Sequence, residues 1–320
     1  MQRTMGMIHC DKVTLTYDGL GDAVSELSFT VEPGSIFALV GPNGAGKTST
    51  LRMLATLLPP TSGEITVDGY DVQRDREEVC RRIGFLPDHF ALYEQMTPVE
   101  LLDFFACCHD VPAAVRGERI ERLIDELDLV QARSSKIRAL SRGTRQRLGM
   151  AKTLVHEPRV LILDEPASAL DPDARVRLQN TLVGLKKRGL AIPISSHILP
   201  ELADIADAVG IIDRGRPVYV GPLEQAELPD EAVYTLEVAR PPKARPVLDA
   251  FDDRLLSFLE VGRGRFELTV RGGAETVGDL VEKLVLRGAR VTQVAPRASR
   301  LEVVYQASMG RGRQPREAAS

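Results

Sequence analysis

The chain has 320 residues, enough for one large domain or two ordinary ones, and its 43% hydrophobic and 27% charged residues are typical of globular proteins. Its formal net charge of -4 lacks the basic excess of a general nucleic-acid binder, so no nucleic-acid partner is expected. No stretch approaches the roughly 18 consecutive apolar residues of a membrane span, and the first residues lack the apolar core of a secretory signal. We therefore expect a cytoplasmic protein.

The first part of the chain predicts strands around a glycine-rich loop. Alternating apolar runs between residues 8 and 40 are broken at glycines and at Pro33-Gly34, which is typical of strands and turns. The stretch GPNGAGKTST, Gly41 to Thr50, follows an apolar strand and precedes leucines at helical spacing, a pattern that predicts a helix ending at Pro59-Pro60. GEITVDG and RRIGFLPD predict two further strands.

A helical block then interrupts the strands, from about residue 89 to 157, where strand signals are absent. The continuous apolar run RVLILDEP is typical of a strand covered on both faces. A helix from Asp173 to Lys187, the strand LAIPISSH and the hairpin AVGIIDRGRPVYVG follow. Strands that alternate with helices predict an α/β domain with a mostly parallel sheet, spanning residues 1–225, into which the helical block is inserted.

A second domain is expected over residues 226–308. Its alternating and helical patterns give the order β-α-β-β-α-β, with PVLDAF as the first helix and RVTQVA as the last strand. This order predicts a small α+β domain of ferredoxin-like arrangement. Residues 309–320 offer little to bury, and we expect a disordered tail there.

The four cysteines form no disulfide framework and no paired C-x-x-C metal site. Cys107-Cys108-His109 could be taken for a metal cluster, but the three residues lie on an apolar helical stretch. We interpret them as buried packing residues rather than ligands.

The glycine-rich loop matches the phosphate-binding pattern G-x-x-x-x-G-K-[ST]. Glycines let successive backbone N–H groups turn toward phosphate oxygens, and the helix that follows presents its positive end. Lys47 would reach the β- and γ-phosphates of a triphosphate, and Thr48 would bind Mg²⁺. The alternative is a chance glycine turn with an exposed lysine. The residues assigned to the nucleotide here are Gly41, Pro42, Asn43, Gly44, Ala45, Gly46, Lys47, Thr48 and Ser49.

Two carboxylates follow the apolar strand VLIL and supply the other half of a phosphate site. Asp164 could hold the magnesium ion, and Glu165 could polarise a water that attacks the γ-phosphate. The alternative is that both residues only cap a buried strand.

The stretch LSRGTRQRL, Leu140 to Leu148, resembles the signature motif of ATP-binding-cassette (ABC) ATPases, usually written LSGGQ-x-Q-R. Ser141 suits a helix N-cap, and Gly143 would let the backbone approach an anion at that helix end. A plain capped helix would explain Ser141 alone. Arg142 and Thr144 depart from the usual signature, in a way similar to the drug-exporter branch of the family.

Other residues resemble ABC motifs in the family's order, over roughly residues 8 to 225. By this resemblance Tyr17 would stack on adenine, Asp171 in SALD would belong to the loop that crosses between subunits, and His197 would be the switch histidine at the γ-phosphate. A strand-edge tyrosine and a packing histidine are the alternatives. Asp88 stands where many relatives have a glutamine that contacts the metal and its water, and by this resemblance we assign Asp88 to the metal.

The resemblance implies a P-loop NTPase core of the ABC ATPase type, with a β-subdomain and a helical insertion, that hydrolyses ATP with Mg²⁺. It further implies that two ATPase subunits bind head to tail, as a homodimer or with a paralogue, and that Ser141 and Gly143 act on the nucleotide of the other subunit. The implied function is to power export of a drug-like, antibiotic or lipid-like substrate through separate membrane permease subunits, at the cytoplasmic face of the membrane. The C-terminal domain is similar to the accessory domain of bacterial drug-exporter ATPases. The alternatives are a soluble ABC ATPase acting on ribosomes or DNA, and a regulatory nucleotide-binding module.

Overall fold

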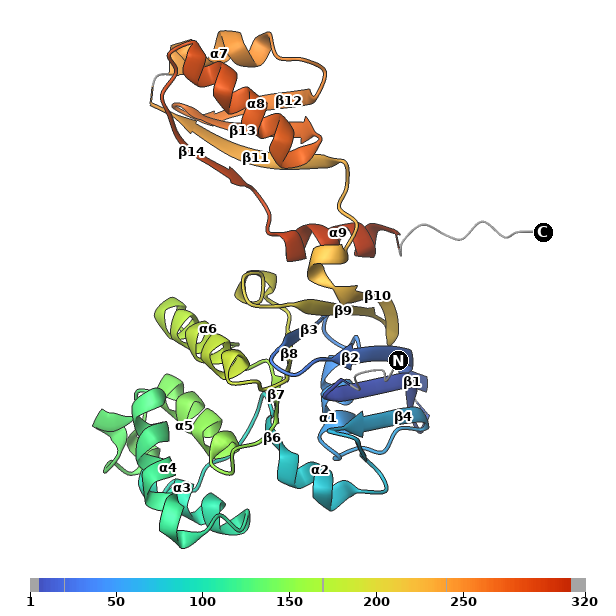
Figure 1. The fold of residues 1–320 in the computed structure, drawn as a ribbon, viewed down its shortest axis with the longest axis vertical. Helices are drawn as coiled ribbons and strands as arrows, with labels where there is room; N and C mark the ends of the chain where they lie inside the picture. The colour runs from blue at the N-terminus through green and yellow to red at the C-terminus, as the bar shows by residue number, and fades with distance from the viewer. Residues whose placement is uncertain (1–5, 20, 169, 240, 312–320) are drawn as a thin grey trace, which may run out of the picture. The chain divides into compact units, whose positions relative to one another are not determined.

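The computed structural model describes residues 6–311, except 20, 169 and 240. The chain divides into two compact units, Met1–Gln225 and Ala226–Ser320, which are described separately (Figure 1). Within the described ranges, no helix combines the length and the apolar character needed to cross a membrane.

The first unit is built on a six-stranded sheet in which five neighbouring strands run parallel (Figure 1). Three of its central strands are buried at every position, because helices or strands cover both faces, and this explains their continuous apolar runs. The predicted, mostly parallel sheet is thus confirmed, with one antiparallel edge strand, β10. In spatial order the strands are β10 (Arg216–Pro222), β9 (Ala208–Asp213), β3 (Ile36–Val40), β8 (Ile192–Ser196), β7 (Val160–Asp164) and β6 (Ile83–Leu86).

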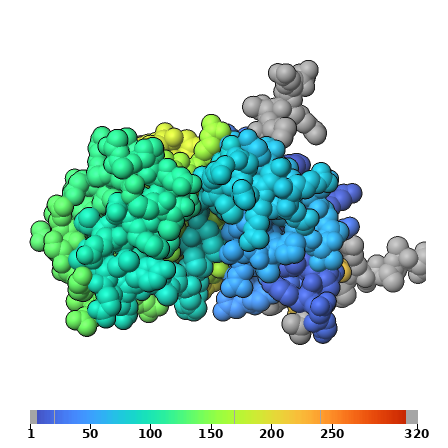
Figure 2. Space-filling model, turned by 90° about the horizontal axis from the view of Figure 1, so that it is seen from below, coloured from blue at the N-terminus to red at the C-terminus, as the bar shows by residue number. Residues whose placement is uncertain are grey.

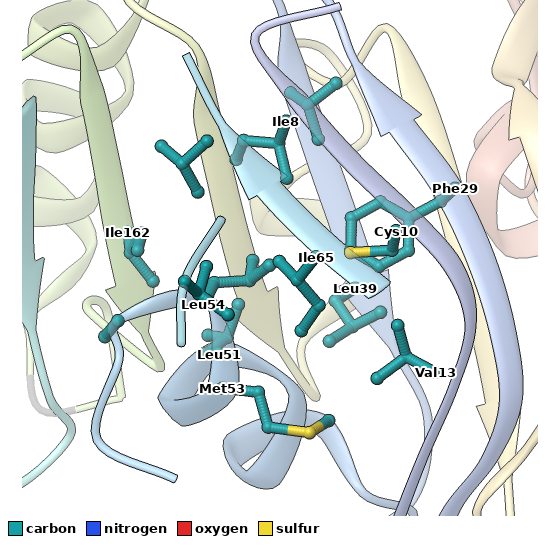
Figure 3. Close-up of a cluster of buried hydrophobic side chains, with 14 of the residues drawn as sticks. Ile8, Cys10, Val13, Phe29, Leu39, Leu51, Met53, Leu54, Ile65 and Ile162 are labelled. Atoms are coloured by element: carbon teal, nitrogen blue, oxygen red, sulfur yellow. The ribbon is translucent and has the colours of Figure 1, made fainter. Parts of the chain in front are cut away.

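A second, antiparallel sheet packs beside the first and encloses the helix that follows the glycine loop. Helix α1 (Lys47–Leu54) buries Leu51, Met53 and Leu54 in a cluster to which both sheets contribute (Figure 3). Ile65 comes from the antiparallel sheet and Leu39 from the central one. Packing from both sides fixes the start of α1, and with it the glycine loop. The strands of the antiparallel sheet are β2 (Gly21–Val31), β1 (Ile8–Tyr17), β4 (Ser62–Val67) and β5 (Tyr70–Asp71).

Helix α1 is shorter than predicted, because it ends at Leu54 and not at Pro59-Pro60. Thr56 adopts a left-handed backbone with φ 61°, and the N–H of Leu57 turns back to the carbonyl of Arg52 at 2.9 Å. The leucine spacing therefore continued past the true helix end. A short helix α2 (Arg76–Arg82), which the sequence pattern did not indicate, precedes β6.

Three helices form the expected helical block: α3 (Pro98–Cys108), α4 (Ala113–Glu126) and α5 (Arg142–Leu154). Thr97 and Glu100 form a capping box at the start of α3, which satisfies N–H groups that the helix itself leaves free. Short 3-10 turns at Val130–Ala132 and Ile137–Ala139 connect α4 to α5. Figure 2 shows this block, in green, beside the strand-rich blue part. Helix α6 (Pro172–Lys187) lies between β7 and β8 in the chain.

The prediction that Cys107 and Cys108 pack in a buried core was wrong, because both side chains are exposed on α3. The helix buries Leu101, Leu102 and Ala106 instead. The ring of His109 stacks on a second histidine, His156, with 3.8 Å between centroids. Over the described parts of the chain, no cluster of three or more His, Cys, Asp or Glu side chains could hold a metal ion.

The second unit has an antiparallel sheet in the order β12-β13-β11-β14 with two helices connecting its strands (Figure 1). Leu236, Phe266, Leu268, Leu280 and Leu284 form the centre of its own core. This order and connectivity are those of the ferredoxin-like arrangement. The elements are β11 (Glu231–Val238), α7 (Pro241–Asp249), β12 (Leu255–Gly262), β13 (Arg265–Arg271), α8 (Gly273–Leu286) and β14 (Val291–Pro296).

Two boundaries of this unit differ from the sequence prediction. Helix α7 begins at Pro241 rather than Pro246, since proline is tolerated in the first turn of a helix. A further helix, α9 (Arg300–Arg311), extends past residue 309, where the sequence predicted a disordered tail. The remainder of that expected tail, 312–320, lies outside the described residues.

Candidate functional site

The site lies where four neighbouring parallel strands end. The loops after β3, β7, β8 and β6 carry Lys47, Glu165, His197 and Asp88 respectively. Ligands in open α/β sheets bind outside the carboxyl ends of the strands, so this edge is the expected place for a nucleotide. A pocket of about 540 Å³ opens here. It is lined by Tyr17, Ala23, Asn43, Gly44, Ala45, Gly46, Lys47, Thr48, Ser49, Asp88, Glu165, Ser168 and His197.

The glycine loop has a backbone that other residues could hardly adopt. Gly44 and Gly46 have φ values of 80° and 105°, and a Cβ on Gly46 would lie 2.4 Å from the carbonyl oxygen of Ala23. Helix α1 begins directly afterwards and directs its N-terminal N–H groups toward the pocket, as in anion sites. The buried Lys47 donates from Nζ to the carbonyl of Gly41 at 2.8 Å. This loop can therefore receive phosphate groups.

Asp164, at the end of β7, is a buried carboxylate whose hydrogen-bond partners come from two other elements. Its Oδ1 accepts from Ser195 Oγ at 2.7 Å and from Thr48 Oγ1 at 3.2 Å. Asp164 pairs with Ser195 in the register of β7 and β8, which brings the two side chains together. The hydroxyl of Thr48 and this carboxylate are hard oxygen donors, the kind that Mg²⁺ prefers.

Glu165 adopts a left-handed backbone, with φ 48°, directly after Asp164. Its N–H donates to Ser195 Oγ at 3.0 Å, which fixes this uncommon turn. Its carboxylate oxygen Oε2 lies 2.6 Å from Nδ1 of His197, and Oε1 lies 3.7 Å from Nζ of Lys47. The carboxylate is thus held between an imidazole and an ammonium group, and all three side chains line the pocket.

Asp88 and Tyr17 line the same pocket. Asp88 Oδ1 accepts from Ser168 Oγ at 3.2 Å, so the loops after β6 and β7 are linked. The hydroxyls of Tyr17 and Ser49 lie 3.2 Å apart, which places the tyrosine beside the start of α1. Asp88 lines the pocket together with Thr48, and Thr48 contacts Asp164. The oxygens of these side chains are of the kind that Mg²⁺ prefers.

Six expected site residues do not line this pocket. Gly41 and Pro42 accept hydrogen bonds from Lys47, and Asp164 accepts one from Thr48, so these three adjoin the lining. The other three, Ser141, Gly143 and Asp171, lie on other elements. Ser141 is exposed and caps α5, accepting from the N–H of Thr144 at 3.2 Å, and Gly143 lies in the first turn of that helix. Asp171 caps α6 in the same way, accepting from the N–H of Ala174 at 2.8 Å. In this chain the signature residues and Asp171 are therefore separate from the nucleotide pocket.

Two further residues contact the site and were not predicted from the sequence. Ser195 was part of the quoted strand, and a polar residue in a fully buried strand was the signal that could have found it. Ser168 lay in the quoted SALD stretch.

Comparison with known proteins gives consistent matches. The family model described as ABC transporter matches residues 24–168. The chain is 32% identical over 322 residues to the daunorubicin resistance ATP-binding protein DrrA3 of Streptomyces coeruleorubidus, covering 95% of this chain and 98% of that protein. It is 30% identical over 272 residues to the uncharacterized ABC transporter ATP-binding protein YhcH of Bacillus subtilis, covering 85% of this chain and 86% of that protein.

A solved structure is similar in fold and in sequence. The structure titled as the ATP binding subunit of an ABC transporter superimposes with a TM-score of 0.64 and 29% identity. The match covers 69% of this chain and 91% of that one.

Proposed function

This chain belongs to the ATP-binding proteins of ABC transporters, and from that premise we propose how its residues use ATP and what the transporter carries. The chain is the subunit that binds and hydrolyses ATP. Subunits of this family work with membrane permease components. Nothing in the comparisons supports the alternative of an ATPase acting on ribosomes or DNA.

The observation that carries the catalytic proposal is the contact between Glu165 and His197. Glu165 is the general base that polarises the attacking water, and His197 holds its carboxylate in the orientation this requires. Lys47 leaves the carbonyl groups of Gly41 and Pro42 to meet the β- and γ-phosphates when a triphosphate enters. Tyr17 supports the adenine at the other end of the pocket.

The magnesium ion would be held by Thr48 and Asp164, with Asp88 nearby. When bound, Mg²⁺ neutralises part of the charge on the phosphates. Ser195 keeps the Asp164 carboxylate turned toward Thr48. Asp88 takes the place of a glutamine here and is restrained by Ser168.

Two subunits close head to tail, so that Ser141 and Gly143 of one cover the nucleotide held by Lys47 of the other. The exposure of Ser141 and its absence from the lining of the pocket in its own chain support this arrangement. The N-terminus of α5 would then direct its positive end at a phosphate of the partner's nucleotide. Asp171, at the start of α6, would lie at the same interface.

The transporter is an exporter of a drug-like, antibiotic or lipid-like substrate, and the chain acts at the cytoplasmic face of the membrane. The similarity to a protein named for daunorubicin resistance, over nearly the whole of both chains, supports this substrate class. The permease that forms the path for the substrate is a separate polypeptide, and the second ATPase unit is another copy or a paralogue.

The test of the catalytic proposal is Glu165→Gln. Turnover should fall about 10²–10⁴-fold, the usual contribution of a positioned base, while ATP affinity is retained. Glu118→Gln, at an exposed position of α4, is the matched control and should keep normal turnover. Near-normal hydrolysis by Glu165→Gln would remove Glu165 from its role.

Two further measurements examine binding and assembly. Lys47→Ala should weaken ATP binding itself, measured by titration calorimetry, and unchanged affinity would contradict the phosphate assignment. Glu165→Gln saturated with Mg·ATP should sediment as a dimer, because the closed state is no longer released by hydrolysis. A monomer under those conditions would argue against the head-to-tail arrangement.

A further inference from the structure

An ion pair lies beside the pocket without lining it. Arg175 of α6 and Glu201 of the 3-10 turn Leu199–Glu201 approach to 3.2 Å between Nε and Oε1. The Glu201 side chain is only 9% exposed. Burial raises the pKa of Glu201, and the guanidinium of Arg175 is the largest opposing influence. Among the described residues, Oε1 accepts no hydrogen bond, so the charge of Arg175 is what compensates this oxygen.

On one side the pair is joined to the loop that follows Glu165 and ends at Asp171. The same Nε–H of Arg175 donates to the carbonyl of Leu170 at 3.1 Å. The N–H of Arg175 also bonds to the carbonyl of Asp171 at 3.0 Å, in the first turn of α6. A displacement of this loop would therefore move the guanidinium.

On the other side the pair is joined to the segment that carries His197. Glu201 Oε2 accepts from Ser196 Oγ at 3.2 Å, and the same hydroxyl accepts from the N–H of Ile198 at 2.9 Å. Ser196 thus restrains the chain on both sides of His197. Since His197 contacts the Glu165 carboxylate through Nδ1 and through its backbone N–H, the position of Ser196 bears on that carboxylate.

We propose that Arg175 and Glu201 are a positioning pair that couples the loop ending at Asp171 to His197, and so sets the orientation of the Glu165 carboxylate. The inference rests on the proposed roles of Glu165 and His197. Neither member of the pair touches the nucleotide pocket, so both act through other residues. In the closed dimer, a partner subunit that presses on this loop would change the catalytic geometry through the pair.

A purely structural role would be to hold α6 against the turn that contains Glu201. Gln179 already makes such a contact, donating to the carbonyl of Glu201 at 2.8 Å. The two roles differ in what they change. A structural role alters the stability of the unit, whereas a positioning role lowers the rate of hydrolysis in a folded protein that binds ATP normally.

The experiment compares Glu201→Gln, Arg175→Gln and the double variant of the full chain in single-turnover hydrolysis of Mg·ATP. Each single variant should lower the rate of hydrolysis about tenfold, while ATP affinity changes by no more than about twofold. A tenfold loss of rate is within the range of interaction energies between residues of one network. The double variant should be no slower than the slower single variant. Arg177→Gln, an exposed arginine on the same helix, is the control and should keep the full rate.

Arg175→Lys keeps the positive charge beside Glu201 and should recover most of the rate lost in Arg175→Gln. Unchanged rates in both single variants would overturn the proposal. So would multiplied losses in the double variant, because they would mean independent effects. Glu165→Gln in the same series distinguishes failure of the proposed function from failure of this inference. If Glu165→Gln hydrolyses ATP at the normal rate, the proposed function fails. If Glu165→Gln is slow but the Arg175 and Glu201 variants have normal rates, this inference alone fails.

Discussion

Ser195→Ala removes the hydroxyl that joins the two carboxylate-bearing residues of the site. Ser195 is fully buried, and its Oγ both donates to Asp164 and accepts from the N–H of Glu165. A hydrogen bond to a charged group contributes roughly 1.5–3 kcal/mol and a neutral one roughly 0.5–1.5 kcal/mol. Asp164 keeps its contact with Thr48, so we expect the unfolding free energy to fall by about 2–3 kcal/mol. The left-handed backbone at Glu165 also loses the hydrogen bond from its N–H to Ser195 Oγ.

Stability and turnover would be measured together on Ser195→Ala. The chain has no tryptophan, so urea unfolding is followed by circular dichroism, with the transition of the first unit separated from that of the second. Turnover should fall about 10–100-fold, since freeing a strained turn alters a site by about 1–3 kcal/mol. Ser134→Ala, at an exposed position, is the control. A loss of stability under about 0.5 kcal/mol with normal turnover would refute the reasoning, because both bonds would then be dispensable.

Two remaining predictions concern the glycine loop and a buried histidine. Gly46→Ala should destabilise the first unit more than Gly44→Ala in urea unfolding. Both substitutions place a Cβ on a residue with positive φ, but only the Cβ at position 46 meets a backbone oxygen. Equal losses of unfolding free energy in the two variants would contradict this. Burial, with the adjacent His109, lowers the pKa of His156 from 6.5 to about 4, and its Nε2–H donates to the carbonyl of Ile83 at 2.9 Å. Between pH 6.5 and about pH 4 the unfolded chain binds a proton at His156 that the folded chain does not bind. The free energy of unfolding should therefore fall by about 2 kcal/mol from pH 7 to pH 5, and His156→Gln should not show this decrease. A variant with the same pH dependence as the parent would rule this out.

The parts of the molecule that could be predicted from sequence are those in which function depends on a short contiguous stretch. The glycine loop needs small residues at fixed positions before a helix, and that need is visible in the residues themselves. The apolar runs of β3 and β7 likewise reveal strands buried on both faces. These two patterns are enough to place the pocket at the edge of a parallel sheet.

The errors arose where a local pattern does not determine the environment. Cys107 and Cys108 lie in an apolar helical stretch, but spacing shows which residues share a face and not which face is covered. Arg175 and Glu201 were missed for a different reason. Most of α6 and the whole of β8 separate the two residues in the chain. Only the packing of α6 beside the segment that follows β8 brings their charges together.

The contacts of the loop after β7 connect the carboxylate that we propose as the base, that of Glu165, to two other parts of the unit. Through Ser168 this loop is bonded to Asp88, which follows β6 and leads into the helical block. Through Arg175 it is bonded to Glu201 and to the segment of His197. We therefore expect a movement of the helical block and a movement at the proposed subunit interface to reach Glu165 through the same short loop. Both ends of this loop are held locally, by the hydrogen-bonded left-handed backbone of Glu165 at one end and by the Asp171 cap of α6 at the other, so we expect a displacement at one end to be felt at the other.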